Sequence, residues 1–529
     1  MPSLYPHEER KIGRGAAESG PVGFLLPCLR GRIGERKPIP PYSAIVYKEG
    51  DEVRADDWKG RKITSGKAGV DDTNVIQSAI DELSYGGVVF IKRGLYIITK
   101  TIEIKNTHIT FIGENRRASD EWGTKLKLAD NANCDMIHVR GIKFYCERME
   151  FDGNESNQTV SDLRIIYDTS GLASDLTLRN VYCWNVAGTF LESTGSHGWL
   201  DGCVFEHADL IAYIKNARLW RFTGNLFYVS GAGLKIEGSA EAHANHFIVG
   251  NSFYYCSSYG IKIVNSFGNN IVGNIFRKVG NGIELENADY NLISGNLIHA
   301  AQKGINQYNS NENSIVGNTF KEIDGNAIYI ENSAKNVINN NFIIDNKATG
   351  IYLNGASYNM IYSNHLINIG SSENDKFWGI ALYHTADIYS THNVVENNII
   401  QSFISNKLAY GIGEKDSLDD YNIIKNNKIS EVTKRAIKRE GANTIIRENI
   451  GWATENSGTA TFNGDGTTTQ FSIAHGLVSE PSKVQVTPMT EDAAGDFYVT
   501  KDTTNIYVNY LSAPPSGSNN VKLSWYAEV

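Results

Sequence analysis

The chain has 529 residues with 50 glycines, 11 prolines and a formal net charge of −9 at pH 7. This length exceeds what one compact core holds but is ordinary for a repeat protein with added domains. The acidic balance argues against a nucleic-acid-binding surface, which needs a basic stripe, so we expect no nucleic-acid partner. The six cysteines form no CxxC pair and no other metal-ligand spacing, so we expect free thiols, no metal site and no cofactor.

Residues 1–42 are rich in Arg, Gly and Pro and show neither strand nor helix periodicity. We expect an N-terminal arm that does not fold alone. No apolar run is long enough to span a membrane, and the N-terminus lacks the apolar core of a secretory signal. We therefore expect no membrane span and no standard export, which fits an extracellular or virion-associated protein released by lysis.

Residues 43–84 are predicted to form short strands followed by one amphipathic helix. Between Asp71 and Leu83 the apolar residues recur at helical spacing, and Gly86 and Gly87 are expected to end the helix. A solenoid needs its open first coil covered, because exposed strand edges and core invite aggregation. We therefore predict that this helix caps a solenoid that follows it.

Residues 85–452 carry an internal repeat. The motifs GIKI, GIEL, GINQ, AIYI and GIYL begin at Gly260, Gly282, Gly304, Ala327 and Gly350, at intervals of 22 or 23 residues. Within each repeat the apolar residues alternate with period two, which indicates strands, and the Asn, Gly and Ser residues between them are turn formers. A period of this length, with three short strands per turn, predicts a parallel β-helix.

An asparagine also recurs in every repeat, just before a short apolar pair. Most of these asparagines follow a second asparagine five residues earlier. Asparagines stacked in successive coils can pass amide hydrogen bonds along the stack, so we interpret them as structural ladders and not as a binding site. The recurring positions are Asn251, Asn274, Asn296, Asn318, Asn341 and Asn364.

The beginning of this region resembles a known family. The helix sequence DDTNVIQSAID, followed by GGVVFIKRGLYIITKTIEI, is similar to the first part of pectate-lyase-type right-handed parallel β-helix proteins, which include viral tailspike depolymerases. The resemblance covers about Asp71 to Trp452 and implies this fold and a polysaccharide or surface glycan as the partner. It does not extend to the paired aspartates of polygalacturonases. The equivalent positions here are Tyr259, Asn281, Lys303, Asn326, Thr349 and Trp378.

Residues 453–529 differ in composition from the repeat. Alternating strand patterns with tight turns, as at Asp465-Gly466, predict a small antiparallel β-domain. The segment resembles terminal modules of viral tail and surface proteins, which implies a homotrimer. The complete prediction is an all-β fold: a right-handed parallel β-helix solenoid with an N-terminal capping helix and a small C-terminal antiparallel β-domain.

Strand alternation predicts which side chains of the repeated GIxI strand point outward. If Ile283 and Leu285 face the core, Glu284 and Glu286 face the solvent. Two coils further on, Glu331 falls in the same column as Glu286, about 9.6 Å away at the backbone, near the upper end of the range for an inverting glycosidase. We therefore predict Glu286 and Glu331 as catalytic residues. The predicted substrate-binding residues are Glu284, Tyr308, Tyr329, Tyr352 and Lys262.

Two functions remain open from the sequence. One is polysaccharide degradation by a glycoside hydrolase or a polysaccharide lyase, as in a viral tailspike-type depolymerase. The other is a non-catalytic glycan-binding adhesin or structural spike protein. The outward Glu and Tyr columns favour the enzyme, and the missing family aspartates favour the binder. Other acids and bases compete for the catalytic role: Glu206, Asp209, Asp152, Glu322 and Asp324 for a hydrolase, and Lys235, Lys262, His243 and His246 for a lyase.

Overall fold

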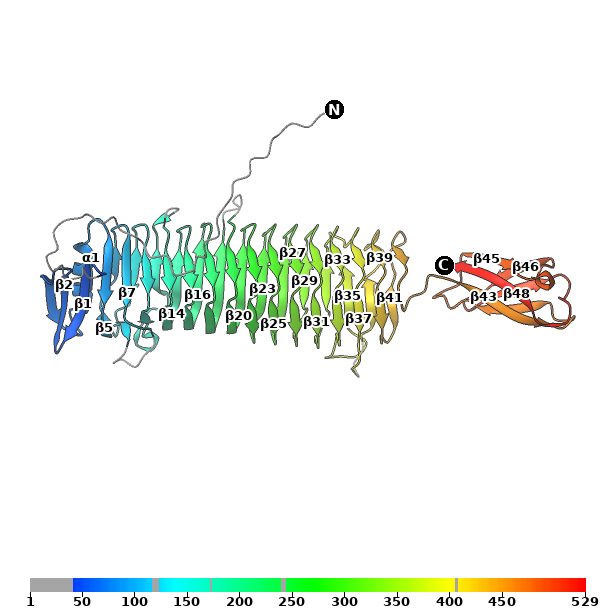
Figure 1. Cartoon of the computed structure of the whole chain (residues 1–529), viewed down its shortest axis with the longest axis horizontal. Coiled ribbons are helices and arrows are strands. Elements are labelled where there is room, and N and C mark those ends of the chain that lie inside the picture. The colour runs from blue at the N-terminus through cyan, green and yellow to red at the C-terminus, as the bar shows by residue number, and fades with distance from the viewer. Residues whose placement is uncertain (1–40, 117–122, 172–173, 239–243, 405–407) are drawn as a thin grey trace, which may run out of the picture. The chain divides into compact units, whose positions relative to one another are not determined.

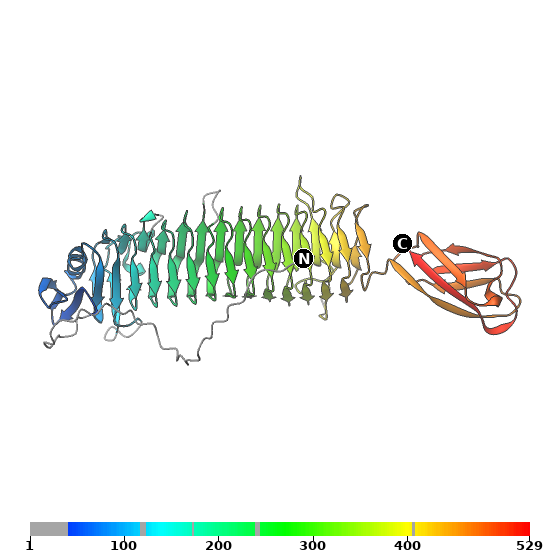
Figure 2. The same cartoon turned by 45° about the horizontal axis from the view of Figure 1, so that its top comes forward.

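The computed structural model describes residues 41–116, 123–171, 174–238, 244–404 and 408–529. Almost all of the predicted arm of residues 1–42 lies outside these ranges, as does His243. Within them the regular structure is almost entirely β-strand, with one α-helix, α1 (Asp72–Asp81). Figure 1 shows the coils of the solenoid stacked in chain order from β5 to β41, and Figure 2 shows the strands of successive coils side by side.

Each coil contributes strands to three faces, and each strand pairs in parallel with its counterpart in the next coil. This arrangement confirms the predicted parallel β-helix. The first face contains β4 (Gly87–Ile91), β7 (Ile109–Gly113), β10 (Tyr145–Glu147), β13 (Thr177–Arg179), β15 (Trp199–Asp201), β17 (Arg221–Thr223), β19 (Phe247–Val249), β21 (Asn270–Val272), β24 (Leu292–Ser294), β27 (Ser314–Val316), β30 (Val337–Asn339), β33 (Met360–Tyr362), β36 (Val394–Glu396), β39 (Ile423–Lys425) and β42 (Ile445–Arg447).

The second and third faces share four long strands that run through both of them: β14 (Tyr182–Ser193), β16 (Val204–Lys215), β18 (Leu226–Glu237) and β20 (Ser252–Val264). The other strands of the second face are β5 (Gly94–Ile98), β8 (Thr124–Leu128), β11 (Glu150–Asp152), β22 (Ile275–Arg277), β25 (Leu297–His299), β28 (Thr319–Lys321), β31 (Phe342–Ile344), β34 (His365–Ile367), β37 (Ile399–Gln401) and β40 (Lys428–Ser430). Those of the third face are β6 (Ile102–Ile104), β9 (Ile137–Val139), β12 (Leu163–Asp168), β23 (Asn281–Glu286), β26 (Lys303–Tyr308), β29 (Ile328–Glu331), β32 (Ile351–Asn354), β35 (Trp378–Tyr383), β38 (Tyr410–Glu414) and β41 (Arg435–Lys438).

The interior of the solenoid is filled by stacks of equivalent apolar side chains. Phe227, Phe253 and Phe276 lie in successive coils, with ring centroids 4.5 and 4.9 Å apart, and all three are fully buried. Because a shift of one residue would turn every inward side chain outward, this packing fixes the register of the coils.

Two buried asparagine ladders run along the solenoid. In the first, Asn296 Nδ2 donates to Asn318 Oδ1 at 2.9 Å, and the Asn296 backbone N donates to the same oxygen at 3.0 Å. The same pattern repeats in neighbouring coils, and a second ladder contains Asn291 and Asn336. These bonds satisfy buried polar groups at the corners and confirm the structural interpretation of the repeated asparagines. The first ladder comprises Asn225, Asn251, Asn274, Asn296, Asn318, Asn341, Asn364, Asn398, Asn427 and Asn449.

The helix α1 caps the first coil together with three strands, β1 (Ala44–Glu49), β2 (Glu52–Asp57) and β3 (Lys62–Lys67). Its apolar face is buried, as predicted for a helix that caps the solenoid. The buried Asp72 carboxylate accepts hydrogen bonds from Lys48 Nζ at 2.8 Å and from the Ile97 backbone N at 2.7 Å, which joins the helix to β5. The helix ends at Asp81, before the predicted Leu83, and Gly86, at a φ of 85°, turns the chain toward β4.

The C-terminal residues form two three-stranded antiparallel sheets. One contains β43 (Glu455–Gly464), β48 (Gly517–Glu528) and β45 (Lys483–Pro488), and the other contains β44 (Gln470–Ala474), β47 (Asn505–Tyr510) and β46 (Phe497–Lys501). Their apolar faces share a core that includes Ile506, Leu523 and Trp525. This is the predicted small antiparallel β-domain. Among the described residues, no helix is both long and apolar enough to cross a membrane.

Candidate functional site

The strand register of the third face places the predicted site residues in two outward columns. Glu284 of β23 pairs with Asn306 of β26, which pairs with Tyr329 of β29. Two positions further along the same strands, Glu286 pairs with Tyr308, which pairs with Glu331. Tyr308 therefore lies on the coil between the two glutamates, and the outward columns follow the order that the sequence predicts.

Lys262 lies between two of the glutamates. Its Nζ is 3.4 Å from Glu284 Oε2 and 3.4 Å from Glu286 Oε2. Glu284 also accepts a hydrogen bond from Asn281 Nδ2, and its side chain is 16% exposed, whereas that of Glu286 is 45% exposed. Lys262 therefore forms an ion pair with both carboxylates and is not exclusive to Glu284.

Glu331 has a different environment. It accepts a hydrogen bond from the Tyr329 hydroxyl, which also receives a hydrogen bond from Asn354 Nδ2 at 3.2 Å. Among the described residues no ion pair involves Glu331. Burial raises the pKa of Tyr308, and the carboxylates of Glu284, Glu331 and Glu286 add to the rise. The three acids therefore surround one phenol.

The tyrosines of this face form a continuous row of rings, one per coil. The ring centroids of Tyr308 and Tyr329 are 5.7 Å apart, those of Tyr329 and Tyr352 are 5.5 Å apart, and those of Tyr352 and Tyr383 are 4.9 Å apart. All four side chains are partly exposed. We call Tyr308, Tyr329, Tyr352 and Tyr383 the aromatic strip. Half-exposed rings in a row offer flat apolar faces with polar hydroxyl groups, as sugar-binding surfaces do.

The aromatic strip leads into a group of rings that the sequence reasoning did not assign to the site. Trp378 lies 5.1 Å from Tyr383 and 5.1 Å from Tyr410, measured between ring centroids. Lys415 and Lys438 place their ammonium groups over the rings of Tyr383 and Trp378, at 5.8 and 5.5 Å. The repeat places Trp378 in register with Thr349 of the preceding coil, but from the sequence that position was compared only with the family aspartates.

Asn306 is the buried member of this surface. It is 1% exposed and lies in the column between Glu284 and Tyr329. Neither its Nδ2 nor its Oδ1 has a hydrogen-bond partner among the described residues. A buried amide without a partner costs free energy, so Asn306 adds little to the stability of the coil.

Most of the competing acids and bases have structural partners. Asp152 is buried, with Lys125 Nζ 3.4 Å from its Oδ2 and Asn154 N donating to its Oδ1 at 2.9 Å. Asp324 pairs with Lys347 at 2.6 Å, and Glu322 with His299 at 3.2 Å. Glu206 accepts a hydrogen bond from Tyr182 at 2.8 Å, and Asp209 lines a shallow cavity beside His207. Lys235 pairs with Glu237 at 2.7 Å, and His246 is fully buried in the core.

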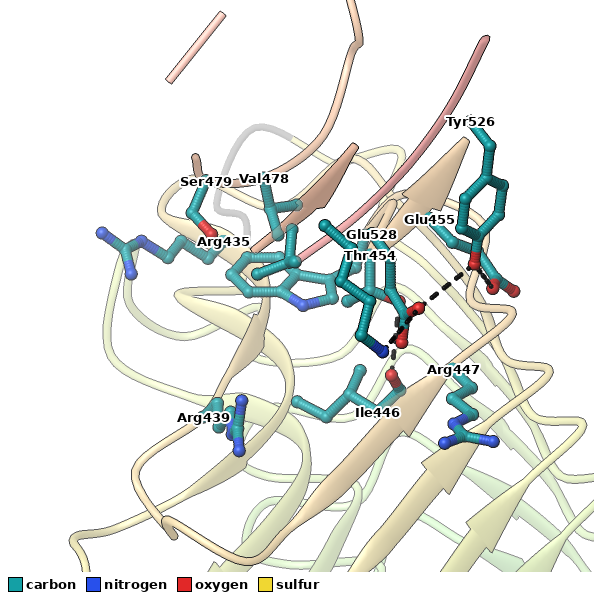
Figure 3. Close-up of a pocket in the computed structure, with 13 residues that line it drawn as sticks. Arg435, Arg439, Ile446, Arg447, Thr454, Glu455, Val478, Ser479, Tyr526 and Glu528 are labelled. Carbon is teal, nitrogen blue, oxygen red and sulfur yellow. Dashed lines mark hydrogen bonds and ion pairs between the residues drawn. The ribbon is translucent and has the colours of Figure 1, made fainter. Parts of the chain in front are cut away.

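A separate cavity of about 550 Å³ is shown in Figure 3. It is lined by residues that follow or belong to the last coils, such as Arg439 and Arg447, and by C-terminal residues. Within the latter, Lys483 Nζ and the Tyr526 hydroxyl both contact Glu528 Oε2, at 3.4 and 3.3 Å. None of the predicted site residues lines it, so it adds nothing to the site on the third face.

Comparisons with known proteins agree with the fold. A family model described as periplasmic copper-binding protein (NosD) matches residues 135–322 and 211–385, which together make up less than half of the chain. No curated protein matches the chain significantly. A tailspike protein of E. coli bacteriophage HK620, solved in complex with a pentasaccharide, is 13% identical with a TM-score of 0.51 over 89% of this chain and 91% of that one.

Two further solved structures have lower TM-scores. The A-module of a mannuronan C-5 epimerase from Azotobacter vinelandii is 16% identical, with a TM-score of 0.39 over 72% of this chain and 96% of that one. An alginate lyase is 14% identical, with a TM-score of 0.43 over 71% of this chain and 86% of that one. These two carry no argument, and at 13% identity the likeness to the HK620 tailspike protein supports the fold alone. The chain is a right-handed parallel β-helix, as its resemblance to that family implied.

Proposed function

We propose that the protein binds a polysaccharide along the third face and cleaves it, as a tailspike-type depolymerase does. The observation that carries this proposal is the aromatic strip, which presents one half-exposed tyrosine ring in each of four successive coils. Coils repeat at about 4.8 Å, close to the length of one sugar unit in an extended chain, so consecutive sugars can contact consecutive rings.

The carboxylates beside the aromatic strip suit hydrolysis with inversion. Glu286 and Glu331 lie two coils apart, about 9.6 Å at the backbone, which leaves room for a water molecule between a general base and a general acid. We assign Glu286, whose Oε2 lies 3.4 Å from Lys262 Nζ, as the base. In this reaction Glu286 takes a proton from the attacking water, and Glu331 gives its proton to the glycosidic oxygen as the bond to the anomeric carbon breaks.

The alternative is a non-catalytic glycan-binding adhesin or structural spike protein. One observation favours it: Glu286 is already paired with Lys262, and Glu331 already accepts a hydrogen bond from Tyr329. Such pairing is ordinary for a solvated strand face that only binds. Under this alternative the aromatic strip still holds the sugar, but the two glutamates have no chemical role.

One experiment separates these functions. A panel of neutral and acidic polysaccharides is incubated with the protein, and both new reducing ends and unsaturated sugars are measured. We expect new reducing ends without unsaturation, and a loss of at least a hundredfold in rate for Glu286→Gln or Glu331→Gln. The matched control is Glu396→Gln on the first face, which is also paired with a lysine, at 3.3 Å from Lys425. Binding without cleavage favours the adhesin, and active Gln variants exclude this catalytic pair.

We further propose that the protein is a homotrimer and that it acts outside the cell or on a virion. A candidate contact surface lies where the first and second faces meet. Over β19, β21, β24, β27, β30 and β33, no outward side chain of the first face is charged, and large apolar residues there are more than a third exposed. These include Phe247, Leu292 and Met360, with Leu297 and Phe342 just beyond the corner. A surface of this kind, about 29 Å long over six coils, fits another copy of the chain.

A further inference from the structure

Three arginines of the last coil gather around one cavity. Arg435 is the first residue of β41, Arg439 directly follows that strand, and Arg447 is the last residue of β42. All three are exposed, and all three line the cavity of about 550 Å³ in Figure 3. They belong to strands on two different faces, so the path of the chain around the last coil brings their charges together.

The charges of these arginines are not neutralised. No ion pair joins any of the three guanidinium groups to a carboxylate among the described residues. Elsewhere in the solenoid such a partner is common: Arg164 Nε lies 3.0 Å from Asp135 Oδ1, and Arg179 Nε lies 3.1 Å from Asp201 Oδ2. Like charges around one cavity repel one another, and the repulsion grows as their surroundings become less polar than water. An anion in the cavity would remove this cost.

One of the three guanidinium groups is held in a fixed orientation. Arg439 Nε donates to Gly441 O at 3.2 Å, and its Nη2 donates to Ala442 O at 2.9 Å. Its Nη1 has no partner among the described residues. Because the guanidinium is planar, two backbone bonds fix the direction of its remaining N–H groups. Less side-chain freedom is then lost when a ligand binds.

The cavity also contains two carboxylates, but they contact other groups. Glu528 Oε2 lies 3.4 Å from Lys483 Nζ and 3.3 Å from the Tyr526 hydroxyl, and the same hydroxyl is 3.4 Å from Glu455 Oε2. Figure 3 shows the guanidinium groups of Arg439 and Arg447 away from both carboxylates. These acids therefore leave the arginine side of the cavity cationic.

Two apolar residues complete the solenoid side of the lining. Ile446 is part of the core of the last coil, and Trp452 packs against that core. Among the described residues, β41 pairs only with β38, and β42 pairs only with β39, so this coil has a neighbouring coil on one side alone. The terminal repeat of a solenoid needs a polar cover over its core. A polar ligand held by the arginines beside Ile446 and Trp452 would contribute to such a cover.

We propose that this cavity binds a polyvalent oxyanion, a polycarboxylate or a polyphosphate, which neutralises the three arginines and stabilises the last coil. Guanidinium groups suit this class because their planar donors match the paired oxygens of carboxylate and phosphate groups. An anion with a single charge leaves most of the repulsion in place, so affinity rises with the charge of the ligand. The site is separate from the proposed function, because it contains no residue of the aromatic strip and needs no glycan.

Isothermal titration of the full chain with citrate, pyrophosphate and acetate tests the site, at one ionic strength set with NaCl because salt alone screens exposed charges. We expect saturable binding of citrate or pyrophosphate and at least tenfold weaker binding of acetate. Arg439→Gln and Arg447→Gln are each expected to lower the affinity at least tenfold, since each removes charged hydrogen bonds. The control is Arg277→Gln, at an exposed arginine of β22 that also has no carboxylate partner among the described residues, and we expect no change.

Unfolding experiments test the effect on the last coil. Without a polyvalent anion, Arg447→Gln is expected to unfold at the same temperature as the wild type or a higher one, because a repulsion is removed. With citrate, we expect the wild type to gain more than Arg447→Gln, and hydrogen exchange in β41 and β42 to slow in the wild type alone. Citrate also stabilises proteins by exclusion from their surface, and comparing the two proteins in the same buffer cancels that general effect.

The relative affinities for citrate and pyrophosphate identify which acidic group the cavity prefers. Two results overturn the proposal: no saturable binding of either polyvalent anion, or an affinity that Arg439→Gln and Arg447→Gln lower no more than Arg277→Gln does. Tyr352→Ala is expected to bind the anion as the wild type does. Failure of the glycan proposal and failure of the anion site are therefore distinguishable.

Discussion

The asparagine ladder makes a quantitative prediction about stability. Asn296 is 1% exposed; its Oδ1 accepts from Asn274 N at 2.9 Å, and its Nδ2 donates to Ile271 O at 2.9 Å. Asn296→Ala leaves the Asn274 amide without this acceptor and the Ile271 carbonyl without this donor. Each buried group that loses its partner costs about 1–3 kcal/mol, so we expect a loss of about 2–6 kcal/mol in the free energy of unfolding.

Asn306→Ala is the matched control, because Asn306, in β26, is also 1% exposed and has no side-chain partner among the described residues. Removing an amide that bonds to nothing is expected to change stability by less than about 1 kcal/mol. Urea unfolding followed by circular dichroism measures both variants, and hydrogen exchange of the Asn274 amide reports the local effect. Equal destabilisation by the two substitutions would refute the claim that ladder hydrogen bonds hold the coils together.

Two further predictions concern pH and assembly. Burial lowers the pKa of His246 to about 3, so the folded state keeps this histidine neutral while the unfolded chain protonates near pH 6.5. The stabilisation that comes from keeping His246 neutral is therefore complete above about pH 6.5. As the pH falls from there toward the folded-state pKa of about 3, the free energy of unfolding decreases by about 1.4 kcal/mol per pH unit for this one proton. In the folded protein the Trp220 backbone N donates to His246 Nδ1, and His246→Asn replaces this acceptor with an amide oxygen. We expect the free energy of unfolding of this variant to depend less steeply on pH. An unchanged slope would contradict this prediction. Leu297→Asp puts a charge on the apolar corner and is expected to lower the mass measured by light scattering. Val160→Asp, at a similarly exposed residue, is the control and is expected to leave the mass unchanged. A wild-type protein that is monomeric would exclude the trimer.

The fold could be predicted from the sequence because a fixed period and an alternating pattern together define the register. Once Ile283 and Leu285 face inward, the positions of Glu284, Glu286 and Tyr308 follow from strand geometry, and the strand pairing agrees. Side-chain contacts could not be derived in this way. That Lys262 is shared by two glutamates depends on where a long flexible side chain settles.

Two parts of the surface escaped the sequence reasoning. The repeat places Trp378 on the same strand as Tyr383, but the contact of its ring with Tyr383 and Tyr410 does not follow from strand register. His384 and Asp419, whose side chains form a hydrogen bond, are 35 residues apart on segments that do not follow the repeat. The repeat period predicts which residues lie side by side only in coils of regular length. Contacts made by the longer, irregular segments cannot be derived from it.

The most direct test of the central claim is the affinity of the aromatic strip for the glycan that the polysaccharide panel identifies. Isothermal titration compares the wild type with Tyr352→Ala, which removes a ring between Tyr329 and Tyr383, and with Tyr358→Ala, which removes an exposed ring that stacks on His392 at another corner. We predict at least a tenfold loss of affinity for Tyr352→Ala, about 1.4 kcal/mol, and no change for Tyr358→Ala. Wild-type affinity in the Tyr352 variant would contradict the claim that the third face binds the polysaccharide.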